Sequence, residues 1–245
     1  MKHILKPLIP KFLLQARRDI INYLSNLSYR NKSAQEVFHK IYQENIWGGE
    51  GDFHSGSGSA DSKVIQPYVK SLKEFCASFE NKPTAVDLGC GDFIIGSQTF
   101  MFFSQYTACD VVKKLIDRNA AKYNHANLKF VALDAIKDAF PQADILIIRQ
   151  VLQHLSNKDI INVILNIGDK FRFWVVTEEI PTKPDFIPNL DKPTGPHIRM
   201  VLVESGSGVV LTKPPFNIKP KSNTLLCHVD MGSSVLETRV YEFGD

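Results

Sequence analysis

Two patterns of apolar residues alternate between residues 84 and 179. Short continuous apolar runs are typical of buried strands, and apolar residues that recur every three or four positions are typical of amphipathic helices. The runs predict five strands, at residues 84–88, 106–111, 128–133, 143–150 and 171–179. The longer period predicts helices between them, at residues 93–103, 113–122 and 159–167. This alternation indicates right-handed βαβ units, and therefore an α/β fold with a doubly wound, mostly parallel sheet and helices on both faces.

Basic and apolar residues dominate the N-terminal arm. Lysines and prolines interrupt its apolar run, which makes the run too short for a membrane span or a signal-peptide core. Five basic residues precede the first acid: Lys2, Lys6, Lys11, Arg17 and Arg18. Such an arm can lie on an anionic membrane surface, and the alternative is a helix docked on the body of the protein. Further amphipathic helices are predicted at residues 34–42 and 63–79, the second with Asp61 or Ser62 as its N-cap.

The pattern changes after the fifth strand. Residues 181–220 hold eight of the thirteen prolines and no helical period. The β-rich segments 224–230 and 238–243 are predicted to pair as a hairpin at the sheet edge. We therefore expect an N-terminal part of arm, short helix and glycine/serine-rich lid (1–62), and an α/β domain (63–245) whose residues 181–222 form an irregular substrate-side region.

The composition is that of an ordinary soluble globular protein. Apolar residues make up 44% of the 245 residues and charged residues 22%. A net charge of +3, without a basic stretch interleaved with aromatic residues, predicts no nucleic-acid partner. The four cysteines include no CxxC pair, so neither a metal site nor a disulfide framework is expected, and a cytoplasmic location fits best. These features leave the oligomeric state open.

The sequence VDLGCGD, at residues 86–92, follows the first predicted strand with a glycine-rich turn. In an open α/β sheet, ligands bind beyond the carboxyl ends of the strands, near the switch point. Gly89 and Gly91 allow the backbone to turn sharply there and to approach a ligand closely. A dinucleotide fingerprint would place a third glycine at position 94, which is Ile94, and Gly96 comes two residues late. The turn therefore disfavours a nicotinamide or flavin cofactor.

Acidic residues stand in or at the ends of the first three strands. Asp110 ends the second strand and is placed to accept hydrogen bonds from ribose hydroxyls. Asp134 ends the third and can accept from the exocyclic amine of adenine, while Asp87, within the first strand, can hold an ammonium group directly or through water. The implied ligand has an adenosine and a cationic amino-acid end, and it needs no pyrophosphate. S-adenosylmethionine fits that description.

Four segments together resemble the class I S-adenosylmethionine-dependent methyltransferases: VDLGCGDF, ACDVV, LDA and ADILIIRQVLQHLS. The resemblance covers residues 63–179. It implies a seven-stranded sheet whose last strand runs antiparallel, with S-adenosylmethionine as cofactor. It assigns cofactor binding to matching positions of this chain: Asp87, Gly89, Gly91, Asp110, Asp134 and Arg149. We expect the neighbouring residues Cys90, Val111 and Ala135 in the same site.

A base is needed if the methyl acceptor is a hydroxyl. Methyl transfer from a sulfonium is an in-line displacement, so the protein otherwise supplies mainly alignment. His154 follows the fourth strand and is the leading candidate for the base, and the resemblance supports it because small-molecule members carry a histidine in an HL pair here. A histidine that packs against the cofactor or caps the next helix is the alternative. His197 and Glu178 are further candidates.

The acceptor is expected to be a small molecule or a glycan hydroxyl. The residues at the end of the fourth strand, IRQV, lack the asparagine- and proline-rich tetrad that would resemble the enzymes that methylate amino groups of nucleic acids. Arg199 is expected to hold an anionic acceptor, with a solvated arginine as the alternative. Phe216, in the proline-rich residues 213–220, is expected in a wall of the acceptor site, with a surface segment as the alternative. The basic arm favours work at the inner membrane face, on a lipid-linked or surface-polysaccharide sugar.

Two other functions could use the same sheet. The missing third glycine and the absence of a YxxxK-like pair oppose a nucleotide-sugar or NAD-dependent oxidoreductase. A non-catalytic cofactor-binding module would be expected to carry a degenerate glycine turn, and this turn is intact.

The segment NIWGGEGDFHSGSGSADS, at residues 45–62, lies directly before the cofactor-binding sheet. It lacks the lysine and Ser/Thr ending of a phosphate-binding P-loop. We predict that it is a lid over the cofactor, with glycines as hinges and Trp47, Phe53 and His54 as covers. Residues 55–59 are expected to bind the methionine carboxylate, among them Ser55, Gly56 and Ser57.

Overall fold

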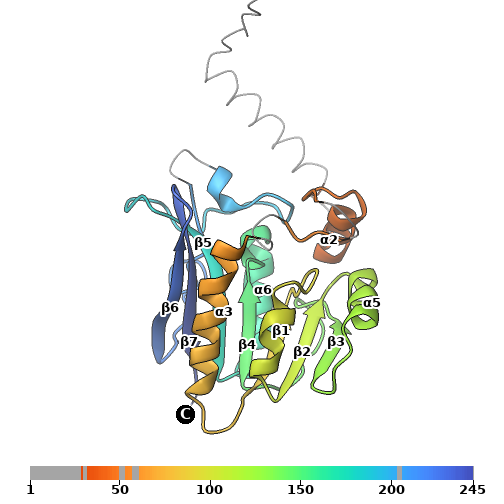
Figure 1. The fold of residues 1–245 in the computed structure, drawn as a ribbon. Helices are drawn as coiled ribbons and strands as arrows, with labels where there is room; N and C mark the ends of the chain where they lie inside the picture. The colour runs from red at the N-terminus through yellow and green to blue at the C-terminus, as the bar shows by residue number, and fades with distance from the viewer. Residues whose placement is uncertain (1–28, 30–31, 50–52, 57–60, 203–205, 245) are drawn as a thin grey trace, which may run out of the picture.

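A computed structural model gives the structure of the chain and describes residue 29 and residues 32–49, 53–56, 61–202 and 206–244. Within them, seven strands form one sheet in the order β3-β2-β1-β4-β5-β7-β6 (Figure 1). The strands are β1 (Thr84–Leu88), β2 (Gln105–Asp110), β3 (Leu128–Ala132), β4 (Ile145–Arg149), β5 (Phe173–Pro181), β6 (Ser222–Asp230) and β7 (Ser234–Glu242). The predicted basic arm, at residues 1–28, lies outside the described residues, as does Ser57 of the predicted lid.

The sheet confirms the predicted mostly parallel fold with an antiparallel last strand. Strands β1 to β5 run parallel, and β7 runs antiparallel to β5. The two late strands pair with each other as predicted, but β7 lies between β5 and β6, so β6 forms the edge. Strand β1 pairs with β2 on one side and with β4 on the other. The switch in strand order therefore falls at β1, which is where open α/β sheets bind ligands.

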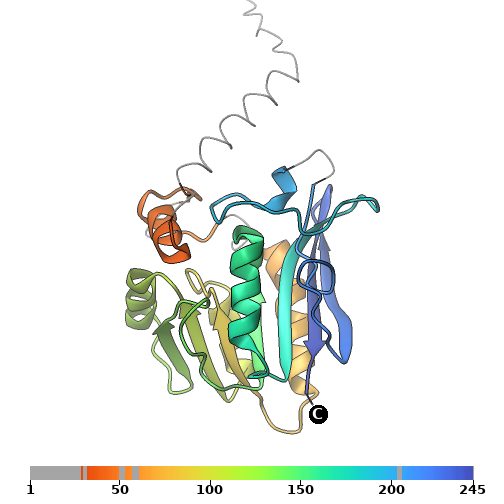
Figure 2. The ribbon, with the colours of Figure 1, turned by 180° about the vertical axis from the view of Figure 1, so that it is seen from behind.

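Helices cover both faces of the sheet, as predicted. One face carries α3 (Ser62–Ala77) and the short α4 (Gly96–Thr99), and the other carries α5 (Lys113–Lys122) and α6 (Asn157–Ile167) (Figures 1 and 2). Strand β4 shows the division, because Ile145 and Ile147 pack in the layer of α3 while Leu146 and Ile148 pack in the layer of α6. Burial on both faces explains why this strand reads as a continuous apolar run.

Side-chain caps set the helix starts. Ser33 and Glu36 form a capping box at α2 (Ala34–Gln43), because the Ser33 hydroxyl accepts from the Glu36 amide and the Glu36 carboxylate accepts from the Ser33 amide. Asp61 caps α3 through the Lys63 amide, as predicted. Ser156 caps α6 and starts it two residues before the predicted position 159. Helix α2 lies beyond the carboxyl ends of β2 and β3 (Figure 1).

Two segments, at residues 93–103 and between β5 and β6, contain little regular helix. The predicted helix at residues 93–103 is only α4 followed by the 3-10 helix η2 (Phe100–Phe102). Its many aromatic and β-branched residues lower helix propensity, and they fill the layer beneath α3 instead. After β5, the described residues up to β6 contain one short 3-10 helix, η4 (Arg199–Val201). No helix in the described part of the chain has the length and apolar character to cross a bilayer.

Candidate cofactor and active site

A cavity of about 400 Å³ opens at the carboxyl ends of β1, β2, β3 and β4. Its wall comes from the turns that follow these strands, from α2, from the described part of the lid and from residues 196 and 198. Most residues predicted for the site line this one cavity: Trp47, Ser55, Gly56, Asp87, Gly89, Cys90, Gly91, Asp110, Val111, Asp134, Ala135, Arg149 and His154.

The glycine turn forms the floor of the cavity. Gly89 and Gly91 adopt φ angles of +73° and +54°, which side chains other than glycine rarely adopt. A Cβ on Gly89 would lie 2.4 Å from Val151 Cγ2. The Gly91 amide donates to Asp110 Oδ2 at 3.2 Å, so the turn is tied to the end of β2. Both positions therefore require glycine, because of the positive φ angles and because the side chains of Val151 and Ser55 approach closely.

One end of the cavity combines an acid and an arginine on the α3 side of the sheet. Asp87 is buried and accepts a hydrogen bond of 2.8 Å from the Tyr106 hydroxyl. Burial raises the pKa of Asp87 to about 7, although the Tyr106 hydrogen bond and Arg149 oppose the rise. Arg149 stacks over the Tyr68 ring at 5.3 Å, and its Nε and Nη2 have no hydrogen-bond partner among the described residues. This end can therefore bind an ammonium group and a carboxylate together.

The other end carries the two remaining strand-end acids. Asp110 Oδ1 accepts from the Val112 amide at 3.0 Å, and burial raises its pKa to about 6. Asp134 Oδ1 accepts from the Ile136 amide at 3.0 Å and Oδ2 pairs with the exposed Lys137 at 3.2 Å. A carboxylate has about four lone-pair sites, so both acids keep acceptor capacity for hydroxyl or amine donors.

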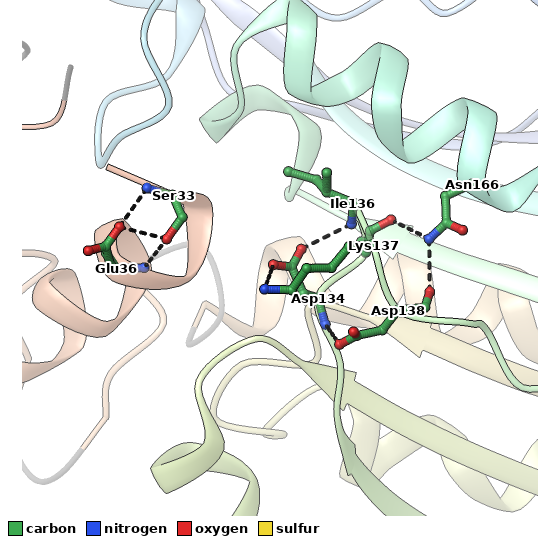
Figure 3. A network of polar contacts seen from close by, with 8 residues as sticks. Ser33, Glu36, Asp134, Ile136, Lys137, Asp138 and Asn166 are labelled. Carbon is green, nitrogen blue, oxygen red and sulfur yellow. Dashed lines mark hydrogen bonds and ion pairs between the residues drawn. The ribbon is translucent and has the colours of Figure 1, made fainter. Parts of the chain in front are cut away.

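A polar network holds the Asp134 loop in place (Figure 3). The Asp134 amide donates to Asp138 Oδ2 at 2.8 Å. Asn166 of α6 donates its amide hydrogens to the carbonyls of Ala135 and Asp138 at 2.9 and 2.8 Å. The capping box of α2, Ser33 and Glu36, lies across from this loop in Figure 3. The loop that carries the predicted adenine ligands is thus fixed to a helix rather than left free.

The described part of the lid lies over the cavity. Trp47 donates from Nε1 to the Pro196 carbonyl at 3.2 Å, and its ring lies 5.1 Å from the His154 ring. The Ser55 amide donates to Asp92 Oδ2 at 3.1 Å, and the Asp92 amide donates to Ser55 Oγ at 2.8 Å. Tyr42 of α2 makes a hydrogen bond of 3.1 Å with Ser55 Oγ. These contacts join the lid to the glycine turn and to Pro196. The opening and closing of the lid stays a prediction.

His154 lines the cavity as a half-buried side chain, and its imidazole is neutral. Burial, with a contribution from the positive charge of Lys192, lowers its pKa to about 3. Its Nδ1 has no hydrogen-bond partner among the described residues. A neutral imidazole has one free lone pair and can accept a proton, but this environment makes it a weak base.

Four residues predicted for catalysis or substrate binding lie outside the cavity lining. Glu178 is buried against the turn before α6, where its carboxylate accepts from the amides of Leu152 and Gln153. Arg199 is 1% exposed, and its guanidinium donates only to protein acceptors. These placements correct the expectation of a substrate-binding Arg199 and of a cavity-facing Glu178. His197 is half-buried between two lining residues, and Phe216 packs against the core instead of forming a cavity wall.

The lining also includes residues that the sequence analysis did not single out, among them Gln150, Glu179 and Met231. Gln150 has a φ of +55°, a strained conformation that turns the chain directly after β4. Glu179 follows Glu178 on β5, and its Oε1 accepts from Ser234 Oγ at 2.5 Å. Because successive strand residues point to opposite faces, only one of the two glutamates can face the cavity. Strand alternation is the signal that could have identified Glu179.

The described residues contain no group of three or more His, Cys, Asp or Glu side chains that could hold a metal ion. All four cysteines are free thiols. Cys90 belongs to the glycine turn, where burial raises the pKa of its thiol well above the usual value. The chemistry of the cavity walls is therefore that of carboxylates, one arginine, a histidine and aromatic rings.

No protein-family model matches the chain, and no curated protein matches its sequence. Solved structures do share its fold. The N-methyltransferase NodS from Bradyrhizobium japonicum, in complex with S-adenosylhomocysteine, is 11% identical with a TM-score of 0.57, over 82% of this chain and 98% of that chain. An S-adenosylmethionine-dependent methyltransferase of Leishmania major is 11% identical with a TM-score of 0.57, over 87% and 88%.

Magnesium protoporphyrin IX methyltransferase from Synechocystis, with bound S-adenosylmethionine, is 12% identical with a TM-score of 0.52, over 86% of this chain and 98% of that chain. At such identities the similarity concerns the fold. The sheet order and the antiparallel β7 agree with it. The chain therefore has the fold of the class I S-adenosylmethionine-dependent methyltransferases.

Proposed function

We propose that the chain is an S-adenosylmethionine-dependent methyltransferase that acts on a hydroxyl of a small molecule or a sugar. One observation carries the proposal. A single cavity, at the switch point of this fold, pairs an acid and an unpartnered arginine at one end with two strand-end acids at the other. Few cofactors other than a nucleoside joined to an amino acid match both ends.

The residues present fit this cofactor group by group. Asp87 would hold the ammonium and the free nitrogens of Arg149 the carboxylate, with Ser55 and Gly56 beside them. Asp110 would accept from the ribose hydroxyls and Asp134 from the adenine amine. Lys137, which pairs with Asp134, is exposed on the surface and can move aside at little cost. When bound, the cofactor supplies a methyl group on a positively charged sulfur.

The chain itself contributes alignment, exclusion of water and a proton acceptor. Trp47 and the lid cover the cavity and keep water from the reacting groups. His154 is the proposed base for the acceptor hydroxyl, acting from its neutral form. Glu179 is the second proton acceptor on the same wall, and as a carboxylate it can bind the hydroxyl before transfer.

The lining residues other than Asp87, Asp110 and Asp134 support a polar, hydroxyl-bearing acceptor. Glu179 and Gln150 offer acceptor oxygens, and Trp47 offers an aromatic face. An aromatic surface beside a few placed polar groups is the usual make-up of a small-molecule site. We propose a sugar hydroxyl for this reason, with a small aglycone hydroxyl as the nearest alternative.

Calorimetry tests the cofactor. S-adenosylmethionine and S-adenosylhomocysteine are expected to bind with micromolar affinity, and NAD(H) is expected not to bind. Binding of NAD(H) with no binding of either sulfur compound would replace this proposal with an oxidoreductase. Methyl transfer into glycan precursors and metabolite extract, read by mass spectrometry, then tests catalysis. Cofactor binding without any transferred methyl group would favour a non-catalytic binding module.

A further inference from the structure

The turn that carries His154 is held by charged side chains on nearly every peptide group. This turn, residues 152–155, includes the 3-10 helix η3 (Leu152–His154) and is called the His154 turn below. On its N–H side, Glu178 Oε1 accepts from the Leu152 amide at 3.1 Å and Oε2 accepts from the Gln153 amide at 3.0 Å. One carboxylate of β5 thus fixes the two peptide groups directly before His154.

All four carbonyls of the turn accept from two basic side chains. Arg199 Nη1 donates to the carbonyls of Leu152 and Gln153 at 3.1 and 3.3 Å, and Nη2 donates to the Leu155 carbonyl at 2.8 Å. Lys192 Nζ donates to the His154 carbonyl at 2.9 Å. Both residues belong to residues 189–199, which are called the strap below. The strap therefore binds the carbonyl groups of the turn, and β5 binds two of its amide groups.

Burying the three side chains that hold the turn costs folding free energy. Arg199, Lys192 and Glu178 are 1%, 4% and 4% exposed. Burying such groups in their charged forms is costly, and burial raises the pKa of Glu178 to about 8 and lowers the pKa of Lys192 to about 7. Apolar residues of similar size often stabilise a fold equally well. Charge-assisted hydrogen bonds, however, impose distance and direction. The feature that they secure here is the placement of the turn, and with it the imidazole that faces the cavity.

We propose that Glu178, Arg199 and Lys192 are positioning residues that fix the His154 turn against the cofactor cavity. The inference rests on the proposed methyltransferase function, because it assigns these residues a purpose in catalysis without contact with substrate. It also gives the strap a role: this segment, which lies between β5 and β6 in the sequence, carries both basic side chains to the His154 turn. The strap also offers the Pro196 carbonyl to Trp47 of the lid.

Hydrogen exchange tests the contacts directly. Glu178→Gln keeps the size of the side chain but replaces one acceptor oxygen with an NH₂ group. At least one of the Leu152 and Gln153 amides then loses its acceptor, and its exchange is expected to accelerate about tenfold or more. Unchanged protection of both amides in a folded Glu178→Gln protein would overturn the proposal.

Turnover and binding together test the positioning role. Arg199→Lys keeps the charge but cannot bond three carbonyls of the turn with one planar group. Methyl transfer into metabolite extract at saturating S-adenosylmethionine is expected to fall by roughly ten- to a hundredfold, while the affinity for S-adenosylhomocysteine stays within about twofold. Arg172→Lys is the matched control, because that exposed arginine pairs with Glu242 at the opposite end of β5 and is expected to change neither quantity.

A melting curve shows whether Arg199→Lys folds, and a second variant tests the proposal if it does not. If Arg199→Lys does not fold, Lys192→Met removes one bond, to the His154 carbonyl, and is expected to lower transfer in the same way. Faster exchange in the turn together with wild-type transfer would refute a positioning role. Failure of the wild-type protein to bind S-adenosylhomocysteine would instead refute the proposed function, and the exchange result would be unaffected.

Discussion

Asp87 should make cofactor affinity depend on pH close to neutrality. Its side chain is buried, and burial raises its pKa from 3.8 to about 7. An ammonium group beside it pairs only with the ionised carboxylate. The raised pKa therefore sets the sign: affinity is greatest above pH 7 and is lost as pH falls through that value.

The size of the effect follows from the same pKa. The rise from 3.8 to about 7 disfavours the anion in the ligand-free protein by about 4 kcal/mol. At a pKa of about 7, roughly 3% of the carboxyl is ionised at pH 5.5 and roughly three quarters at pH 7.5. The affinity for S-adenosylhomocysteine is therefore expected to rise about 25-fold over this interval.

Calorimetry with S-adenosylhomocysteine between pH 5.5 and 7.5 measures this rise, in a window where an α-amino group stays mostly protonated. Tyr106→Phe removes the hydroxyl that donates to Asp87 at 2.8 Å, so the pKa of Asp87 rises further. The midpoint is then expected to shift up by about one to two pH units, since a hydrogen bond to a charged group contributes about 1.5–3 kcal/mol.

Asp87→Asn is the control, and it should bind weakly and with a flat profile above about pH 7. A residual dependence around pH 6 would belong to Asp110, whose pKa burial raises to about 6. If the wild-type profile is flat and Asp87→Asn binds equally well, Asp87 does not pair with the ligand's ammonium group, and the assignment of this end of the cavity fails.

Three substitutions test other parts of the site. Arg149→Met should weaken S-adenosylhomocysteine roughly ten- to a hundredfold but leave methylthioadenosine, which lacks the carboxylate, unaffected by calorimetry; equal losses for both ligands would contradict the assignment. Gly89→Ala should destabilise the protein by about 1–3 kcal/mol in thermal unfolding, because of its φ of +73° and the contact with Val151, and adding Val151→Ala should restore only part. Ser55→Ala removes the acceptor of the Asp92 amide, so limited proteolysis of the lid should be faster, and an unchanged cleavage rate would show that this bond does not hold the lid.

The sheet and the cofactor end of the site could be predicted because their signals are local. A strand followed by glycine places Gly89 and Gly91 at a turn, whatever the rest of the chain does. Asp110 and Asp134 follow their strands directly, so their positions at the sheet edge depend only on the strands being parallel. The four residues meet in one cavity because each obeys the same topological rule.

The acceptor side could not be predicted in the same way because its contacts are long-range. Arg199 and the His154 turn are more than forty positions apart, and nothing in the sequence near Arg199 distinguishes a buried structural arginine from an exposed one. Strand alternation puts Glu178 and Glu179 on opposite faces of β5, but choosing between them required knowing which face of β5 meets the cavity. The adjacent glutamates make different contacts: Glu178 binds the His154 turn and Glu179 lines the cavity.

The lid connects these two sides of the site. Ser55 binds Asp92 beside the glycine turn, and Trp47 binds the Pro196 carbonyl of the strap while its ring packs on His154. The first contact joins the lid to the cofactor-binding turn, and the second joins it to the strap and His154. Both contacts lie on the predicted lid segment, so this segment is joined to the glycine turn and to the strap at once. Weakening the grip of Arg199 on the His154 turn should therefore loosen the lid as well, even though Arg199 touches no residue of the lid that the structure describes.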